Sequence, residues 1–214
     1  MVTPCTFRSW SRSARPGQPG RPRLLEAQIV RRRVSIRGAI MIGGQRIQVG
    51  RPHAGPHFTD RVEAAQQLVA SSNLTPELAD ADRELLINTL RSRRQAIGDR
   101  GAAEQLLHGE PHPGNVLSTK TRLLFIDLET CCRGPVEFDL AHVPEDVSER
   151  YADADEELLS ECRILVLAMV AAWRWDRGDQ LPNGQRAARE LLSALREGPP
   201  WPALDVVMRR PDGP

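Results

Sequence analysis

The sequence has 214 residues, of which 27% are charged and 40% hydrophobic, and its formal net charge is +1 at pH 7. This length allows one domain with a substantial core but falls short of two full domains. The near-neutral total gives no reason to expect a specific nucleic-acid ligand, yet it hides two unlike parts. Residues 1–57 contain eleven arginines and one acidic residue, whereas residues 58–214 contain 18 basic and 27 acidic residues.

The first part, residues 1–57, is rich in Arg, Pro and Gly, most clearly over residues 12–23. Such a composition cannot bury enough apolar surface to fold, so the sequence predicts disorder here. It also resembles GC-rich DNA translated in a wrong reading frame. Only residues 36–49 alternate weakly, which predicts a strand pair around Gly43 and Gly44.

From Phe58 onward the apolar residues recur at helical spacing. Thr59 is predicted to cap a helix that continues through about Ala70. Thr75, followed by Pro and Glu, is predicted to open a second and longer helix, with residues 91–94 on its solvated face. Its expected core-facing stripe is Leu78, Ala81, Leu85, Leu86 and Leu90.

Three further helices are predicted over residues 137–149, 153–177 and 185–196. The apolar run Ile164–Ala172 is too short, and too closely flanked by charges, to cross a membrane. It is therefore expected to form the buried central helix of a helical domain covering residues 58–200. The Pro-rich tail, residues 201–214, is expected to pack loosely.

The most informative segment is His-Gly-Glu-Pro-His-Pro-Gly-Asn, residues 108–115. Pro111, Pro113 and Gly114 exclude a helix and predict a tight loop. Residues 115–118 and 121–127 then predict two short strands joined by a polar turn. Such a hairpin brings Asp127 back beside Asn115.

This segment resembles the core of the aminoglycoside phosphotransferase and choline kinase family, whose members have a protein-kinase-like fold. A carboxylate at Glu110, an amide at Asn115 and a second carboxylate at Asp127 repeat the order found in kinase catalytic loops. Residues 134–141, Gly-Pro-Val-Glu-Phe-Asp-Leu-Ala, resemble the family's Gly-x-x-x-x-Asp-Leu-Ala stretch.

The resemblance implies a mostly α, kinase-like C-terminal lobe that uses ATP and Mg²⁺ to phosphorylate a small-molecule hydroxyl. Glu110 occupies the place of the catalytic base, where the family usually has Asp, and the extra methylene moves the carboxylate by roughly an ångström. Asn115 and Asp127 match the Mg²⁺ ligands. The residues that match the family's structural support of the loop are His108, His112 and Asp139.

The only lysine of the chain is Lys120, which follows the loop, so no lysine precedes the loop to hold the ATP phosphates. This favours a second hypothesis, in which the chain is a truncated, non-catalytic kinase-like fragment or pseudoenzyme with a basic extension. A zinc site at His108 and His112 is disfavoured, because the residues between them cannot form a helical turn.

Two other groups of residues, the cysteines and an acidic cluster, are explained in the first place by structure rather than by function. The four cysteines contain no Cys-x-x-Cys pair, so they are interpreted as small apolar residues of a cytosolic protein rather than as a disulfide framework. The acidic residues Asp153, Asp155, Glu156 and Glu157 stand near the family's acceptor-binding region. They are interpreted first as a helix start favoured by the helix dipole.

Overall fold

The computed structural model describes residues 41–42, 45–46, 55–119, 123–202 and 204–209. The predicted strand pair is confirmed at four of these residues, because β1 (Met41–Ile42) and β2 (Gln45–Arg46) pair antiparallel. The predicted disorder over residues 1–57 falls almost entirely outside the described residues. The same is true of Lys120 and of Gly43 and Gly44.

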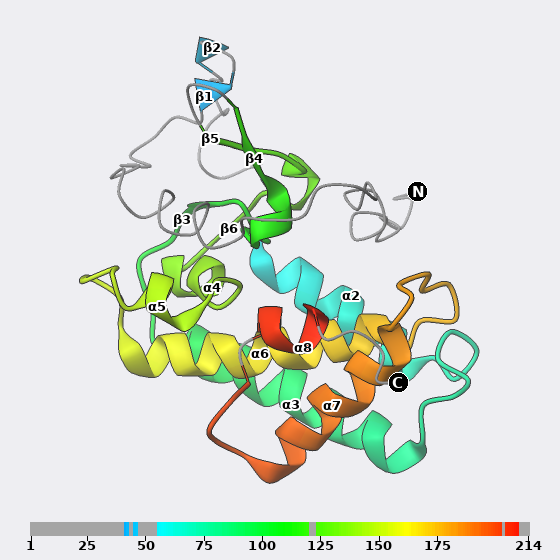
Figure 1. Ribbon diagram of the computed structural model, residues 1–214. Helices are drawn as coiled ribbons and strands as arrows, with labels where there is room; N and C mark the ends of the chain where they lie inside the picture. Colours follow the sequence, from blue (N-terminus) through cyan, green and yellow to red (C-terminus); the bar gives the residue numbers. More distant parts are fainter. Residues whose placement is uncertain (1–40, 43–44, 47–54, 120–122, 203, 210–214) are drawn as a thin grey trace.

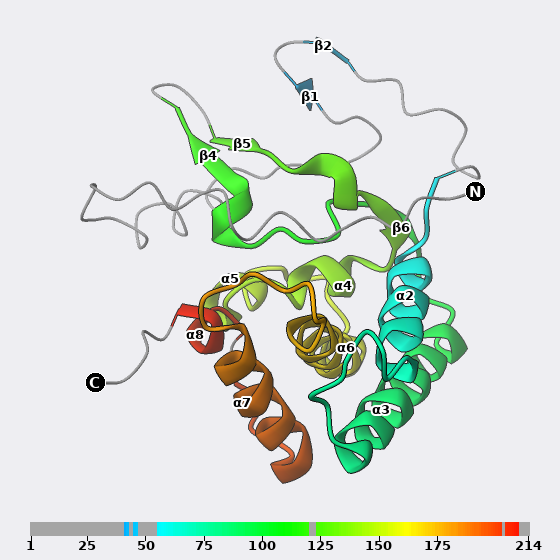
Figure 2. The same cartoon turned by 90° about the vertical axis from the view of Figure 1, so that its right-hand side faces the viewer.

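The rest of the described chain is predominantly helical, as predicted (Figure 1). The helices are α2 (Phe58–Ala70), α3 (Asp80–Asp99), α4 (Val136–Leu140), α5 (Glu145–Ser148), α6 (Glu156–Arg174), α7 (Gly184–Glu197) and α8 (Leu204–Arg209). In Figure 2 the helix α6 is seen end-on, with α2 and α3 on one side and α7 and α8 on the other. It packs against α2, α3, α4 and α7.

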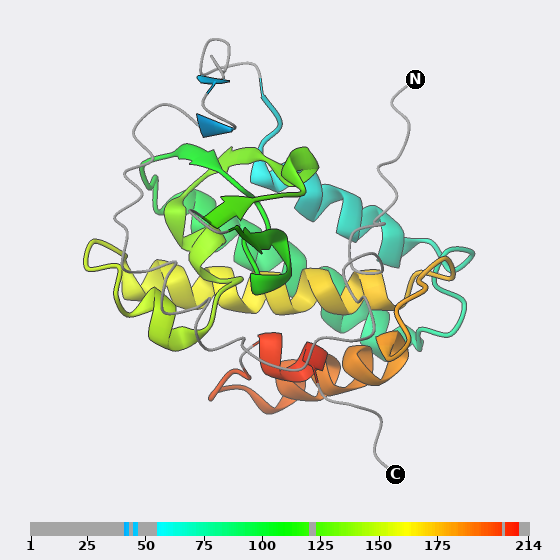
Figure 3. The same cartoon turned by 45° about the horizontal axis from the view of Figure 1, so that its top comes forward.

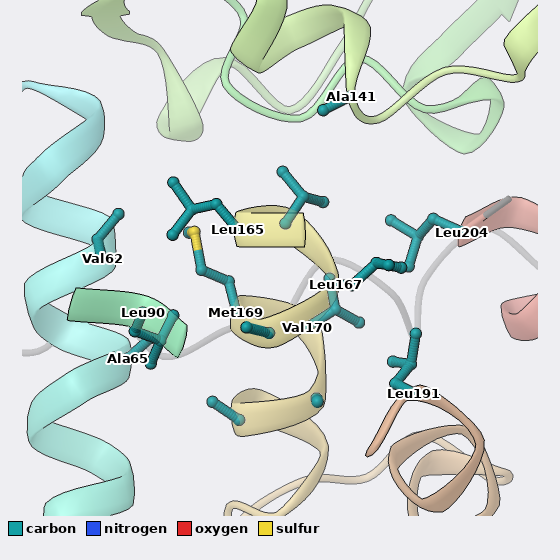
Figure 4. Close-up of a cluster of buried hydrophobic side chains, with 14 of the residues drawn as sticks. Val62, Ala65, Leu90, Ala141, Leu165, Leu167, Met169, Val170, Leu191 and Leu204 are labelled. Atoms are coloured by element: carbon teal, nitrogen blue, oxygen red, sulfur yellow. The ribbon is translucent and has the colours of Figure 1, made fainter. Parts of the chain in front are cut away.

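Helix α6 is central because almost its whole surface is apolar after its first two turns. Every residue from Leu165 to Ala172 is buried, which confirms the predicted central helix. Figure 4 shows Leu165, Met169 and Val170 of α6 within a cluster of side chains from neighbouring helices. Among the described residues, no helix is long and apolar enough to span a membrane.

The start of α2 differs from the prediction, because His57 rather than Thr59 is the N-cap. The ring nitrogen Nδ1 of His57 accepts from the backbone N–H of Thr59, and Oδ2 of Asp60 accepts from the backbone N–H of His57 at 2.8 Å. Histidine is not among the usual capping residues, so the pattern pointed to the nearby hydroxyl instead. Val62, Ala65 and Val69 are buried on one face of the helix.

Helix α3 begins at Asp80, five residues after the predicted cap at Thr75. Arg83 explains the delay, since its guanidinium donates to the carbonyl oxygens of Val69, Thr75 and Leu78 and to the Thr75 hydroxyl. The Thr75 and Leu78 carbonyls are thus satisfied outside a helix. In α3 the buried side chains are Leu86, Leu90 and Ile97, and Ala81 is exposed.

The predicted helix over residues 137–149 is two short helices, α4 and α5, separated at Pro144. Proline disfavours helical geometry in the residue before it, which accounts for the break. The tail also differs from the prediction of loose packing: Leu204 and Val207 of α8 lie in the hydrophobic core. The prediction for residues 185–196 is confirmed by α7.

Two small antiparallel sheets lie over the helices (Figure 3). The strand β3 (Gln105–Leu107) pairs with β6 (Cys132–Gly134), a pairing that was not predicted. The predicted hairpin is confirmed: β4 (Val116–Ser118) pairs with β5 (Leu123–Phe125), and Val116 lies opposite Phe125. The loop of residues 108–115 and the hairpin that follows it both lie between β3 and β6 in the sequence.

His142, just after α4, makes the stability of the fold depend on pH. Its side chain is buried, Nδ1 hydrogen-bonds the Phe138 carbonyl at 2.8 Å, and the ring packs edge-on against the Phe138 ring. Burial, and secondarily the charge of Arg61, lowers the pKa of His142 to about 3. The ordinary value is 6.5, so below that pH the unfolded chain binds a proton that the folded chain does not.

We therefore expect the His142 contribution to be intact above pH 6.5 and to be lost as the pH falls toward 3. The expected loss is about 1.4 kcal/mol per pH unit, or roughly 2 kcal/mol between pH 6.5 and 5. Urea unfolding at several pH values measures it, with His142→Gln as the comparison. An equally steep decline in that variant would contradict this assignment.

Candidate active site

The loop between β3 and β4 ends in a 3₁₀ turn, Pro113–Asn115. His112 caps this turn: its Nδ1 accepts from the backbone N–H of Gly114 at 3.0 Å. Pro113, at the first position of the turn, has no backbone N–H and therefore needs no acceptor there. The turn thus fixes the backbone at Asn115, which is 4% exposed.

His108 ties the start of the loop to the end of β5. One ring nitrogen, Nε2, lies 2.9 Å from the carbonyl oxygen of Ile126. The other, Nδ1, lies 3.3 Å from the backbone nitrogen of Glu110. A backbone N–H can only donate, so Nδ1 accepts, and the Nε2–H tautomer donates to Ile126.

Asp139, in α4, accepts two hydrogen bonds from the loop backbone. Oδ2 lies 2.9 Å from the nitrogen of His108, and Oδ1 lies 2.8 Å from the nitrogen of Gly109. Burial raises the pKa of Asp139, and the two backbone N–H groups oppose that rise by favouring the carboxylate. The loop and α4 are therefore joined at two consecutive residues.

Gly109 lies where the loop passes closest to the turn after β5. Its φ is +85°, and a Cβ added there would lie 2.1 Å from the carbonyl oxygen of Thr130. The Thr130 hydroxyl donates to the His108 carbonyl at 2.8 Å. No other residue type fits this position without moving the backbone, because both the conformation and the close approach require glycine.

Glu110 is buried, with 2% of its surface exposed. Its Oε2 lies 3.5 Å from Nη2 of Arg61 in α2, and its Oε1 lies 4.0 Å from Nε2 of His112. Arg174, the last residue of α6, is close enough for the Glu110 charge to raise its pKa, although burial lowers that pKa overall. The sequence motif did not indicate either arginine.

Asn115 joins the loop to the hairpin. Its Nδ2 donates to the carbonyl oxygen of Glu110 at 2.9 Å, so the amide nitrogen faces the loop. The amide oxygen is then the atom that could ligate a cation. Its own carbonyl accepts from the backbone N–H of Ile126 at 2.9 Å. Asp127 follows directly, so the structure brings the predicted residues Glu110, Asn115 and Asp127 into one neighbourhood.

Asp127 has φ 63° and ψ 51°, a left-handed conformation. It is the only non-glycine residue with positive φ in the described part of the chain. Aspartate tolerates this conformation better than most residues, but it remains a backbone cost of the kind found at functional sites. The side chain is half-buried, at the start of the 3₁₀ turn Leu128–Thr130.

The donor set fits Mg²⁺ rather than a soft metal. The described residues contain no group of three or more His, Cys, Asp and Glu side chains placed to hold a metal. Mg²⁺ is commonly held by one or two protein oxygens together with substrate phosphates, so Asp127 and the Asn115 amide oxygen suit that mode. They do not form a preformed cage.

The nearby cysteines are not suited to ligation or nucleophilic attack. Cys131 is half-buried, Cys132 and Cys162 are buried, and these three thiols are free. Burial raises the pKa of Cys132 to about 12 and raises the pKa of Cys131 and Cys162 as well. They are protonated at neutral pH, and the predicted role as small apolar residues is confirmed for Cys132 and Cys162.

The acidic residues at the start of α6 act on the helix itself. Asp155 is the N-cap, and its Oδ1 accepts from the backbone N–H groups of Glu157 and Leu158, each at 3.0 Å. The hydrogen bond from Leu158 is the main cause of the lowered pKa of Asp155. Arg100 pairs with both Asp155 and Glu157. These contacts favour the capping interpretation over an acceptor site.

The loop, the hairpin and the surrounding helices define a kinase-like phosphotransferase lobe. The family model for the phosphotransferase enzyme family matches residues 43–197, and the chain therefore belongs to that family. This confirms the family predicted from the loop motif. A search of the curated proteins finds no match.

Two solved structures show the same fold. The choline kinase LicA from Streptococcus pneumoniae superposes with a TM-score of 0.53 and 17% sequence identity, covering 68% of this chain and 57% of that protein. A choline/ethanolamine kinase family protein from Mesorhizobium loti gives a TM-score of 0.53 at 14% identity, covering 72% of this chain and 59% of that protein. The match thus spans less than three fifths of either protein.

Proposed function

We propose that the chain is an ATP- and Mg²⁺-dependent phosphotransferase that transfers the γ-phosphoryl group to a hydroxyl of a small molecule. The observation that carries this proposal is the pair of hydrogen bonds made by Asn115, one to the Glu110 carbonyl and one from the Ile126 N–H. They join the Asn115 side chain to the Glu110 backbone and the Asn115 backbone to the residue before Asp127, and phosphoryl transfer depends mainly on positioning of this kind. We assign the activity to residues 58–200.

In this proposal Glu110 accepts the proton of the acceptor hydroxyl. Its longer side chain, in the place of the family's usual Asp, is held by Arg61 on one oxygen and faces His112 on the other. Asn115 and Asp127 hold Mg²⁺ through oxygen atoms. The bound ion neutralises phosphate charge, while the chain's own residues orient the acceptor and receive its proton.

Asp139 and His108 hold the loop that carries these groups in place. Asp139 accepts from the backbone of His108 and Gly109, and His108 donates to the Ile126 carbonyl. The two similar structures are of a choline kinase and of a choline/ethanolamine kinase family protein, which favours amino alcohols among the acceptors to be tried first. The three free thiols fit a reducing compartment, so we place the activity in the cytoplasm.

A second candidate is a non-catalytic kinase-like protein. It is favoured by the position of the single lysine, Lys120, which follows the catalytic loop. Kinases use a lysine upstream of this loop to hold the ATP phosphates, and arginine does not simply replace it. We therefore expect weak ATP binding and slow transfer from this chain.

A coupled ADP-release assay with a panel of amino alcohols and aminoglycosides tests the proposal. We expect slow turnover that Glu110→Gln lowers by about a hundredfold or more, because the general base is lost. Asp127→Asn is expected to abolish the stimulation by Mg²⁺. Glu129→Gln, an exposed carboxylate in the adjoining turn, is the matched control and should keep wild-type turnover.

Turnover that is indifferent to Glu110 would show that the base is assigned wrongly. If the folded wild-type chain releases no ADP with any acceptor, the second candidate is supported. Binding of ATP without turnover would be the signature of a pseudoenzyme.

A further inference from the structure

The catalytic loop has a partner outside its own motif, Arg61 in the first turn of α2. Its Nη1 donates to the carbonyl oxygen of Gly109, and its Nη2 lies 3.5 Å from Oε2 of Glu110. The guanidinium also lies over the ring of Trp173, 5.1 Å from the ring centre. One side chain therefore contacts two consecutive loop residues while packing on α6.

The contacts of Arg61 are strengthened by the burial of the groups involved. The Glu110 side chain is 3% exposed and that of Arg61 is 16% exposed, so solvent screens the pair only weakly. Gly109 is confined as well, because a Cβ added there would lie 3.2 Å from Nη1 of Arg61 and closer still to Thr130. Arginine suits this place, since its planar fork donates in two directions and stacks on an aromatic ring.

Other charged groups also lie near Glu110. His112 lies 4.0 Å away at the other carboxylate oxygen. Arg174, from the end of α6, is paired with Asp179 at 3.0 Å. Asp139 contacts the loop only through the backbone N–H groups of His108 and Gly109. Arg61 contacts both the Gly109 backbone and the Glu110 carboxylate.

We propose that Arg61 is a positioning residue for phosphoryl transfer, which fixes the longer Glu110 carboxylate by pairing with it while anchoring the loop backbone at Gly109. This inference rests on the proposed function. A purely structural Arg61 would act through its hydrogen bond to the Gly109 backbone, which does not depend on the length of the side chain at position 110. A positioning Arg61 also acts through the ion pair with Glu110, which does require the length of the glutamate side chain.

The first test is a double-mutant cycle in the ADP-release assay with Arg61→Gln, Glu110→Asp and the double variant. Arg61→Gln should lower kcat by about tenfold to a hundredfold while leaving KM for ATP within about threefold, because a misplaced base affects the chemical step more than nucleotide binding. In the Glu110→Asp background the same substitution should cost less than about threefold. Arg61→Lys, which keeps the charge, should recover part of kcat.

The matched control is Arg94→Gln, which removes the same side chain from a pair with Glu63 at 2.6 Å, where both partners are more exposed. It should leave kcat unchanged. Equal losses from Arg61→Gln in both backgrounds would overturn the inference without touching the proposed function. Loss of turnover in Glu110→Gln together with normal turnover in Arg61→Gln would do the same.

The second test does not need turnover. Hydrogen exchange at the amides of His112 and Asn115, which donate to the carbonyls of Glu110 and His112, reports the order of the loop. We expect Arg61→Gln and Glu110→Gln each to speed this exchange by about tenfold, and the double variant to be no faster than either. Additive effects would overturn the inference, and so would unchanged exchange in Arg61→Gln. If turnover is absent from the wild-type chain, only the proposed function fails, and the exchange result decides whether Arg61 positions the loop.

Discussion

Replacement of Arg174 by Met is expected to lower the free energy of unfolding by about 3–5 kcal/mol. The Arg174 side chain is 2% exposed, and its Nη1 lies 3.0 Å from Oδ1 of Asp179. Burial lowers the pKa of Arg174 and raises that of Asp179, so each charge is costly in the interior without the other. The variant also removes a positive charge near Glu110. Urea unfolding at pH 7 measures the loss.

The double variant Arg174→Met with Asp179→Leu should recover most of this stability. Apolar residues of similar volume often replace a buried ion pair at little net cost, whereas removing one partner leaves an uncompensated charge. Arg150→Met is the control, because Arg150 lies 3.7 Å from Asp146 and both side chains are exposed. Its expected cost is below about 1 kcal/mol. Equal midpoints for Arg174→Met and Arg150→Met would show that the buried pair contributes no more than a surface pair.

Hydrophobic periodicity predicted the existence of the long helices but not all of their starts. The central helix α6 was predictable because residues 165–172 are apolar on every face, a pattern typical of a buried helix. The start of α3 was not, since the carbonyls near Thr75 are satisfied by Arg83, which lies eight residues further along the chain. The pairing of β3 with β6 escaped prediction because three residues are too few to show alternation.

The candidate site was predictable where its geometry is local. Proline, glycine and the hairpin place Asn115 and Asp127 within one short segment, and their spacing indicates their proximity. Arg61 and Arg174 were not predicted, because they come from α2 and from the end of α6, far from the loop in the sequence. In sequence Arg61 is one of many arginines near a helix start. Only the packing of α2 against the loop distinguishes it.

Asp139→Ala is expected to cost about 3–5 kcal/mol of stability and to loosen the catalytic loop. The substitution removes the acceptor from two consecutive backbone N–H groups, those of His108 and Gly109, and each unsatisfied donor costs about 1–3 kcal/mol. Asp139→Asn should cost about half as much, because its amide oxygen still accepts one of the two hydrogen bonds while its NH₂ group cannot accept the other. Urea unfolding and hydrogen exchange at the two amides measure both effects.

The control for this comparison is Asp146→Ala, in which the exposed carboxylate of α5 is removed and only a surface ion pair with Arg150 is lost. It should change the unfolding free energy by less than about 1 kcal/mol and leave loop exchange unaltered. If Asp139→Ala instead keeps the His108 and Gly109 amides as protected as in the wild type, the carboxylate does not brace the loop. The loop would then be held by His108 at the Ile126 carbonyl and by Thr130 at the His108 carbonyl, whose hydrogen bonds the substitution leaves in place.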